Sequence, residues 1–113
     1  MLTVYGIKNC DTVRKALAWL NDQGIAYTFH DVRADGLNAA LVQRWVDALG
    51  WESVLNRRST TWRNLPDSDK SSLNDVTVIS MVLTHPTLLK RPLFEGEGLI
   101  LQGFTDDVRA RLG

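Results

Sequence analysis

The chain has 113 residues, and its 13 basic side chains balance its 13 acidic ones, so the formal net charge is zero. Balanced charge without a basic block gives no electrostatic reason to expect a nucleic-acid or membrane-surface partner. No apolar run approaches the ~20 residues of a membrane span, and the amino terminus lacks an apolar segment of signal-peptide type. We therefore expect one cytoplasmic domain over residues 1–113, large enough to bury a core.

The first segment combines a strand pattern with a helix pattern. Residues 2–6 are short and β-prone, which predicts a buried strand. Apolar side chains then recur at helical spacing at Val13, Ala16, Leu17 and Leu20. Asp11 or Thr12 would cap this helix and Gly24 would end it. Cys10 thus falls in a strand-to-helix turn, beside the first helical turn.

Cys10 is the only cysteine, which excludes an internal disulfide and, with two scattered histidines, a zinc-site spacing. Two interpretations of it stay open, because a free cysteine is most often a small buried hydrophobe. At a helix start, however, unpaired backbone N–H groups and the helix dipole favour the nucleophilic thiolate. Lys8, Arg14 and Lys15 add positive charge nearby. We expect these effects to outweigh the opposing Asp11 carboxylate, which makes Cys10 the candidate nucleophile.

The middle of the chain alternates between strand and helix patterns. Residues 26–32 alternate apolar and polar side chains, which predicts a second strand, joined in parallel to the first by a right-handed crossover. Apolar side chains at helical spacing predict a helix over about 37–49, and residues 51–55 predict a short helical turn. Residues 56–65 are polar and basic, which is typical of an ordered but irregular loop.

The carboxyl-terminal part combines helices with a hairpin. Pro66 and the acidic residues after it predict a helix start. A longer helix is expected after Asn74, ending before Pro86, because proline disfavours helix in the residue before it. Residues 92–95 and 99–102 predict two strands joined by a hairpin turn at 96–98. Thr105 would cap a last helix.

Three segments together carry a resemblance to a known family: residues 4–16, 55–63 and 88–93. In this order they resemble the arsenate-reductase-C-like family, which also contains the Spx regulators, and are most similar to its YffB-like members. The resemblance covers nearly the whole chain. It implies an α/β, thioredoxin-like fold with a mixed central sheet, in the order β-α-β, helices, β-β-α, with a helical insertion over about 37–89.

The same resemblance implies a glutathione-dependent thiol reductase with Cys10 as the nucleophile. Arg91 would bind the anion, because a planar guanidinium can donate two parallel hydrogen bonds to an oxyanion or a carboxylate. Pro92 matches the proline that thioredoxin-like folds keep in the cis form beside the active cysteine. The expected substrate- and glutathione-binding set is completed by Lys8, Asn9, Arg14, Arg57 and Arg58.

The chain departs from the arsenate reductases of this family at three places. These enzymes have a histidine at the position of Gly6. Their first anion-binding arginine falls on Asn56, although Arg57 and Arg58 are close enough in sequence to serve. Their remaining arginine falls in the stretch 92–108, which contains none here. An arsenate reductase coupled to glutathione and glutaredoxin is therefore the alternative rather than the first expectation.

Spx regulators carry a second cysteine at the position of Val13. Without such a partner, an oxidised Cys10 must be resolved by an external thiol. We expect glutathione as co-substrate and partner, glutaredoxin as a further partner, no metal, and a monomer. A non-catalytic regulator that binds RNA polymerase, as Spx relatives do, is the second alternative.

The aromatic and histidine side chains are expected to have structural roles. Trp19, Trp45 and Trp51 fall on the apolar faces of predicted helices and are predicted to lie in the core. His30 and His85 lack neighbouring partners for acid–base catalysis or metal binding.

Overall fold

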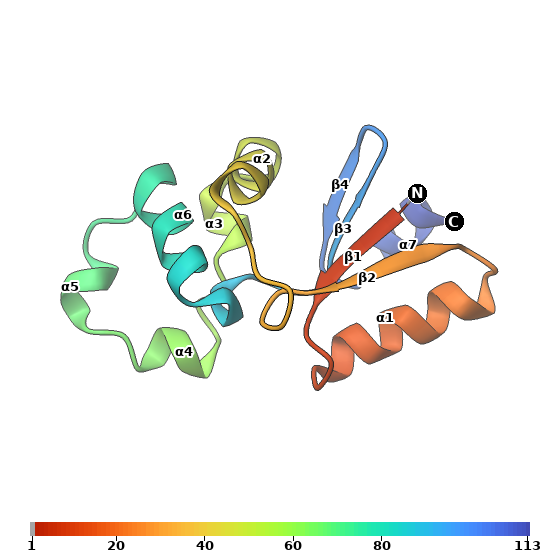
Figure 1. Ribbon diagram of the computed structural model, residues 1–113, viewed down its shortest axis with the longest axis horizontal. Helices are drawn as coiled ribbons and strands as arrows, with labels where there is room; N and C mark the ends of the chain where they lie inside the picture. The colour runs from red at the N-terminus through yellow and green to blue at the C-terminus, as the bar shows by residue number, and fades with distance from the viewer. Residues whose placement is uncertain (1) are drawn as a thin grey trace. The chain divides into compact units, whose positions relative to one another are not determined.

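The computed structural model describes residues 2–113, which form two compact units (Figure 1). The first unit comprises residues 2–35 together with Arg91–Gly113, and the second comprises Gly36–Lys90. The helical segment expected over about 37–89 lies within the second unit. The assignment of the whole chain to a single domain stays a prediction.

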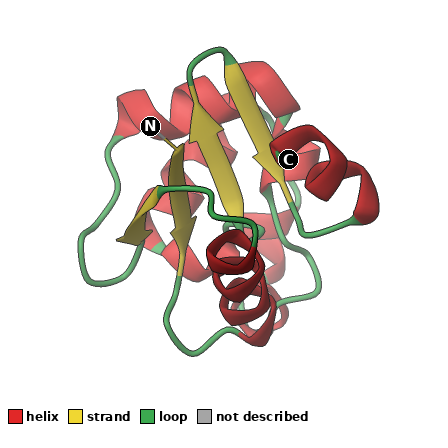
Figure 2. Cartoon of the chain, turned by 90° about the vertical axis from the view of Figure 1, so that its right-hand side faces the viewer, coloured by secondary structure: helices red, strands yellow, loops and turns green. Residues whose placement is uncertain are grey.

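The first unit is an α/β fold with a four-stranded mixed sheet in the order β2-β1-β3-β4, drawn as arrows in Figure 2. Its elements are β1 (Leu2–Gly6), α1 (Asp11–Asp22), β2 (Tyr27–Asp31), β3 (Leu93–Gly96), β4 (Leu99–Gln102) and α7 (Asp106–Leu112). β1 pairs with β2 in parallel, whereas β1 with β3 and β3 with β4 are antiparallel. The predicted parallel crossover and hairpin are both confirmed.

One row of side chains across the sheet forms the centre of this unit's core. Val4 pairs with Phe29 on one side and with Phe94 on the other, and Phe94 pairs with Leu101. Since side chains on paired positions point to the same face, the row presents one continuous apolar surface. α1 and α7 cover that surface with Ala16, Leu20 and Val108.

α1 packs unusually close to the end of β1. A Cβ atom built on Gly6 would lie 2.7 Å from Val13 Cγ2 and 3.0 Å from Val13 Cγ1. Val13 is fully buried, and its β-branched side chain has little freedom to move aside. Gly6 is therefore required by the helix that packs against it.

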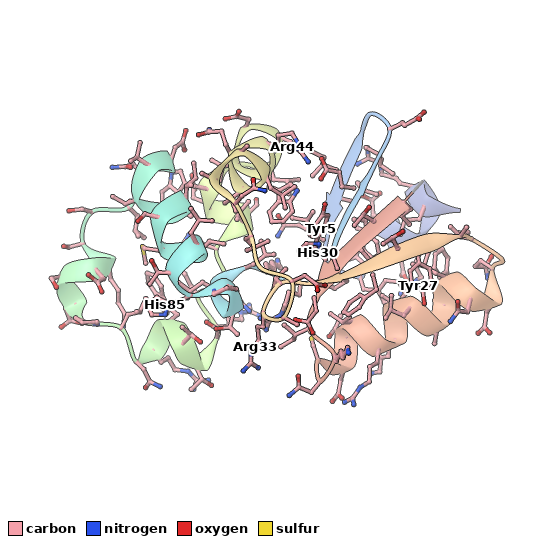
Figure 3. The ribbon with its side chains drawn as sticks, viewed as in Figure 1. Tyr5, Tyr27, His30, Arg33, Arg44 and His85 are labelled. Atoms are coloured by element: carbon pink, nitrogen blue, oxygen red, sulfur yellow. The ribbon has the colours of Figure 1, made fainter. Side chains whose placement is uncertain are left out.

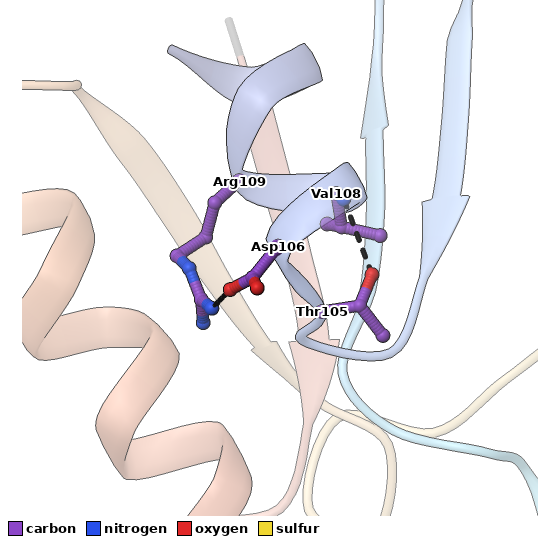
Figure 4. A network of polar contacts seen from close by, with 4 residues as sticks. All are labelled: Thr105, Asp106, Val108 and Arg109. Carbon is purple, nitrogen blue, oxygen red and sulfur yellow. Dashed lines mark hydrogen bonds and ion pairs between the residues drawn. The ribbon is translucent and has the colours of Figure 1, made fainter.

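α7 is held at its amino terminus by side-chain contacts (Figure 4). The Thr105 hydroxyl accepts a hydrogen bond from the Val108 N–H at 3.2 Å, which confirms the predicted cap. Asp106 forms an ion pair with Arg109 in the next turn, and the Arg109 guanidinium lies 4.8 Å from the Phe104 ring centre. Acidic residues at the helix start and basic ones near its end also suit the helix dipole.

The second unit consists of helices joined by loops, with one isolated antiparallel bridge between Leu55 and Leu89. It contains α2 (Ala39–Leu49), α3 (Trp51–Val54), α4 (Thr60–Arg63), α5 (Asp67–Lys70), α6 (Asp75–Thr84) and a 3₁₀ turn, η1 (Pro86–Leu88). The expectation of an irregular loop over 56–65 is wrong in part, because α4 forms within it. Ser59 explains this helical turn, since its hydroxyl accepts from the Trp62 N–H at 3.1 Å.

The longer helices of the second unit begin at side-chain caps and bury an apolar core. Asn38 caps α2 through the Leu41 N–H at 2.9 Å, and Asn74 forms a reciprocal capping box with Thr77. Trp45 is fully buried, as predicted, whereas Trp19 of the first unit is only partly buried and packs against that unit's core. Within residues 2–113, the helices are too short or too polar to cross a lipid bilayer.

We predict that Gly6→Ala destabilises the chain by about 1–3 kcal/mol, because the new methyl group overpacks the contact with Val13. Urea unfolding of Gly6→Ala, Val13→Ala and the double variant would measure this. Val13→Ala removes the clashing methyl groups, so the double variant should lose less stability than the sum of the single ones. Additive losses would contradict the packing argument.

Candidate active site

One edge of the four-stranded sheet gathers the sequence segments that carry the candidate site in the first unit. β1 and β2 are parallel and end at this edge, with Gly6 paired to Asp31. The turn bearing Cys10 follows β1 directly. β3 is antiparallel to β1 and starts at the same edge, just after Arg91 and Pro92. Segments far apart in sequence therefore meet where the strands end.

Cys10 is the N-cap residue of α1, with extended backbone angles (φ −99°, ψ 122°) and a half-buried side chain. The prediction that Asp11 or Thr12 caps this helix is wrong, because the helix already begins at Asp11. No side chain accepts a hydrogen bond at this cap. Cys10 is thus the N-cap residue, the position whose side chain normally serves the first-turn N–H groups.

The charges around Cys10 differ from the sequence expectation in one respect. Arg14 forms an ion pair with Asp11, so these two charges compensate each other in the first helical turn. Both side chains are largely exposed, and such a pair contributes little to stability. Lys8, Asn9 and Lys15 are exposed. Lys8 and Lys15 are therefore the cations near the thiol that have no ion pair with Asp11.

The peptide bond between Arg91 and Pro92 is cis, as the family resemblance implies. Pro92 is buried and Arg91 is half-buried. The Pro92 carbonyl accepts a hydrogen bond from the Gly103 N–H at 2.8 Å, which ties the start of β3 to the residue after β4. Arg91 therefore precedes a residue whose backbone is fixed by a hydrogen bond to the segment after β4.

The second unit holds Arg57 and Arg58 beside a cavity of about 270 Å³. Two chain segments run side by side here, because the Asn56 N–H donates to Leu88 O at 2.7 Å and the Lys90 N–H donates to Val54 O at 2.9 Å. The pairing also brings Lys90 to the cavity, a contribution that sequence reasoning did not identify. The cavity lining consists of Glu52, Ser53, Leu55, Asn56, Arg57, Arg58 and Lys90.

Within this cavity, Asn56 has a local structural role. Its side-chain oxygen accepts from the Arg58 N–H at 3.1 Å, and its carbonyl accepts from the Ser59 hydroxyl at 3.0 Å. The Arg57 guanidinium lies over the Trp51 ring, 5.8 Å from the ring centre. The residue at the family's arginine position therefore shapes the turn that presents the two neighbouring arginines.

Asp31 is a further polar residue of the first unit that sequence reasoning did not identify. Its side chain is only 8% exposed. One carboxylate oxygen accepts from the N–H groups of Arg33 at 2.9 Å and Ala34 at 3.0 Å. These hydrogen bonds form an Asx-type turn, for which aspartate is a typical residue.

The environment of Asp31 favours its ionised form. Burial alone raises the pKa of this carboxyl group, but the backbone N–H groups of Ala34, Arg33 and Lys8 and the charge of Lys8 act in the opposite direction. Their combined effect holds the pKa of Asp31 below its ordinary value of 3.8.

His30 and Tyr5 lie side by side on neighbouring strands (Figure 3), with ring centres 4.9 Å apart. This contact is consistent with a packing role for His30. Among residues 2–113, no group of three or more His, Cys, Asp and Glu side chains is placed to hold a metal ion.

The predicted site residues divide between the two units. Cys10, Lys8, Asn9, Arg14, Arg91 and Pro92 belong to the first unit, and Arg57 and Arg58 belong to the second. The structure brings the first group to one sheet edge and places the second group beside one cavity. The roles of these residues in binding and catalysis stay predictions.

A family model described as the ArsC family matches residues 5–111. The chain belongs to the ArsC family. A solved structure named YFFB (PA3664) protein has a similar fold, with a TM-score of 0.95. It is 40% identical to this chain and covers 99% of this chain and 98% of that one. The ArsC fold, α/β and thioredoxin-like with a mixed sheet, is thereby confirmed.

Other relatives of this ArsC-family chain have varied descriptions. An uncharacterized protein of Haemophilus influenzae is 48% identical over 106 residues, which cover 94% of this chain and 93% of the relative. An arsenate reductase (ArsC) related protein from Brucella melitensis has a solved structure with a TM-score of 0.78 and 41% identity, covering 97% of this chain and 92% of that one. The global transcriptional regulator Spx of Enterococcus faecalis is 31% identical, covering 95% of this chain and 82% of the relative.

We predict that Asp31→Asn lowers the free energy of unfolding by about 1–3 kcal/mol at pH 7, because charge-assisted hydrogen bonds are lost. The folded chain lowers the pKa of Asp31, so its stabilising effect is complete above the unfolded value near 3.8. That effect is lost as the pH falls through the folded pKa. Urea unfolding at pH 7 and pH 3 should therefore show a smaller difference between variant and wild type at pH 3.

The matched control for this prediction is Asp22→Asn, which changes an exposed aspartate of the same unit. It should stay within about 0.5 kcal/mol of wild type at both pH values. A difference for Asp31→Asn that is equal at both pH values would contradict the stated role of the ionised carboxylate.

Proposed function

We propose that this ArsC-family chain is a cytoplasmic, glutathione-dependent thiol reductase in which Cys10 is the nucleophile. The observation that carries the proposal is the position of Cys10 as the N-cap of α1, where no side chain serves the first-turn N–H groups. A thiolate there gains from those N–H groups and from the helix dipole. The nearby Lys8 and Lys15 add to the same effect, since Asp11 is paired with Arg14.

The reaction needs two exchange steps. In the first, the Cys10 thiolate attacks a mixed disulfide between a substrate thiol and glutathione, bonds to the glutathione sulfur and releases the substrate thiolate, which takes up a proton. In the second, a glutathione thiolate attacks the sulfur of glutathione bound to Cys10, which forms glutathione disulfide and restores the Cys10 thiolate. Two electrons pass from glutathione to the substrate, and no second protein cysteine is required.

Glutathione carries two carboxylates, which guanidinium groups can bind through paired hydrogen bonds. We assign one to Arg91, which lies at the sheet edge beside the start of β3. Taken by itself, the cavity lined by Arg57, Arg58 and Lys90 in the second unit suits an anion, because cations outnumber its one acidic residue, Glu52.

Gly6 and Val13, which are in contact, weaken the two alternatives, an arsenate reductase and an Spx-like regulator. Arsenate reductases of the family have a histidine at position 6, but here Val13 leaves no room for a side chain on Gly6. Spx regulators have a cysteine at position 13, and Val13 cannot form a disulfide with Cys10. These departures favour a single-cysteine thiol reductase over arsenate reduction and over a redox-switched regulator.

We predict that Cys10→Ser abolishes glutathione-dependent reduction of a mixed-disulfide substrate, because a serine hydroxyl is not an effective nucleophile toward a disulfide. The assay follows glutathione disulfide formation with a glutathionylated peptide. Asn21→Ala, which changes an exposed uncharged residue on the same helix, should retain activity within about two- to threefold of wild type. Unchanged activity in Cys10→Ser would overturn the proposal, and so would arsenite release by wild type, with glutaredoxin supplied, in the absence of disulfide reduction.

We predict that Arg91→Ala raises the KM for glutathione roughly tenfold or more, with a smaller effect on kcat, because a charge-assisted paired contact is lost. Steady-state kinetics with varied glutathione would measure both constants. Arg111→Ala, which removes an exposed arginine of α7, is the matched control and should leave KM unchanged. An unchanged KM in Arg91→Ala would show that Arg91 does not hold the glutathione carboxylate.

A further inference from the structure

Gly103 lies directly after β4, where the chain leaves the sheet and continues toward α7. Its φ angle is 78°, in the left-handed region that residues with a Cβ atom rarely adopt. A Cβ atom built on Gly103 would meet nothing within 4 Å, so lack of space does not require a glycine here. What the glycine supplies is therefore its backbone conformation.

With this φ angle the chain continues toward α7 while the Gly103 N–H still bonds to the start of β3. The N–H donates to the Pro92 carbonyl at 2.8 Å, within the ordinary range of such hydrogen bonds. The last pair in the ladder between β3 and β4 is Leu93 with Gln102. The Gly103 bond therefore extends the pairing of these strands by one residue, up to the residue that follows Arg91.

The Arg91 side chain depends on this anchor because part of it is packed. The Arg91 Nε atom is buried, although the residue as a whole is half-buried. A packed side chain follows its own backbone, since close packing leaves it little freedom to compensate a shift with another rotamer. A displacement of the Pro92 carbonyl would therefore also displace the Arg91 guanidinium group.

We propose that Gly103 is a positioning residue for glutathione binding, which holds Arg91 in place through the hydrogen bond to the Pro92 carbonyl. The inference rests on the proposed function, since it takes Arg91 to bind a glutathione carboxylate. A guanidinium group donates two parallel hydrogen bonds only when its plane is correctly oriented, so a small shift weakens the contact. Gly103 acts through Arg91, whereas the Cys10 turn follows a different strand, β1.

The test compares Gly103→Val with Gly103→Asn. A β-branched valine strongly disfavours a positive φ angle, whereas asparagine tolerates one better than most residues with a side chain. Gly98→Val is the matched control, because Gly98 also has a positive φ angle, 66°, and open space around its Cβ position. Gly98 lies in the turn between β3 and β4, at the end of these strands away from Arg91. The KM for glutathione, kcat and stability in urea are measured for all three variants.

We expect Gly103→Val to raise the KM for glutathione roughly three- to tenfold and to keep kcat within about twofold, because the guanidinium group is misplaced and the Cys10 turn is not. Gly103→Asn should keep the KM within about twofold of wild type. Gly98→Val should lose stability as Gly103→Val does but keep the wild-type KM. An unchanged KM in Gly103→Val, or an equal KM increase in Gly98→Val, would overturn the positioning role.

An NMR measurement reports the position of Arg91 without glutathione. Because the Arg91 Nε atom is buried, its proton is shielded from exchange with water and can be observed. This resonance should shift in Gly103→Val, and by a smaller amount in Gly103→Ala, which replaces the valine variant if that variant does not fold. It should stay near its wild-type position in Gly103→Asn and Gly98→Val, and an unshifted resonance in every variant would overturn the inference. Failure of the proposed function is seen separately, as a wild-type chain that reduces no disulfide.

Discussion

The close approach of α1 to the end of β1 is the constraint on which the candidate site depends. Val13 occupies the space that a side chain on Gly6 would need, so the helix begins immediately beside the strand end. The short turn between them leaves Cys10 at the N-cap. Cys10 therefore lies at the start of α1, and this position follows from the packing of Val13 against Gly6.

The sheet edge around this turn is joined by hydrogen bonds between segments distant in sequence. The Val32 N–H donates to Gly6 O, and the Pro92 carbonyl accepts from the Gly103 N–H. Below the edge, the apolar row formed by Val4, Phe29, Phe94 and Leu101 gives these turns a packed support. A rigid sheet that presents reactive groups on its connecting turns is a common arrangement for functional sites.

The positions that separate this chain from other ArsC-family proteins are physically linked. Gly6, where arsenate reductases have a histidine, and Val13, where Spx regulators have a cysteine, are in contact. A larger residue at one position therefore requires a smaller or differently placed one at the other. In the second unit, Asn56 stands at an arginine position of the reductases and uses its side chain to shape the turn before Arg58. Gly6 and Asn56 thus distinguish this chain from the arsenate reductases of the family.

The sequence by itself determined the elements whose signals are local. Alternating and helical apolar patterns predicted β1, α1, the β3–β4 hairpin and the cap at Thr105, and a specific combination of segments predicted the family. The sequence did not predict α4, because the polar composition of residues 56–65 indicated a loop, whereas the Ser59 side chain caps a helical turn there. Only the tertiary structure decided that Cys10 is the N-cap, that Asp31 is buried and that Lys90 and Arg57 line one cavity. These features depend on contacts between residues far apart in the chain, which local propensity and spacing do not encode.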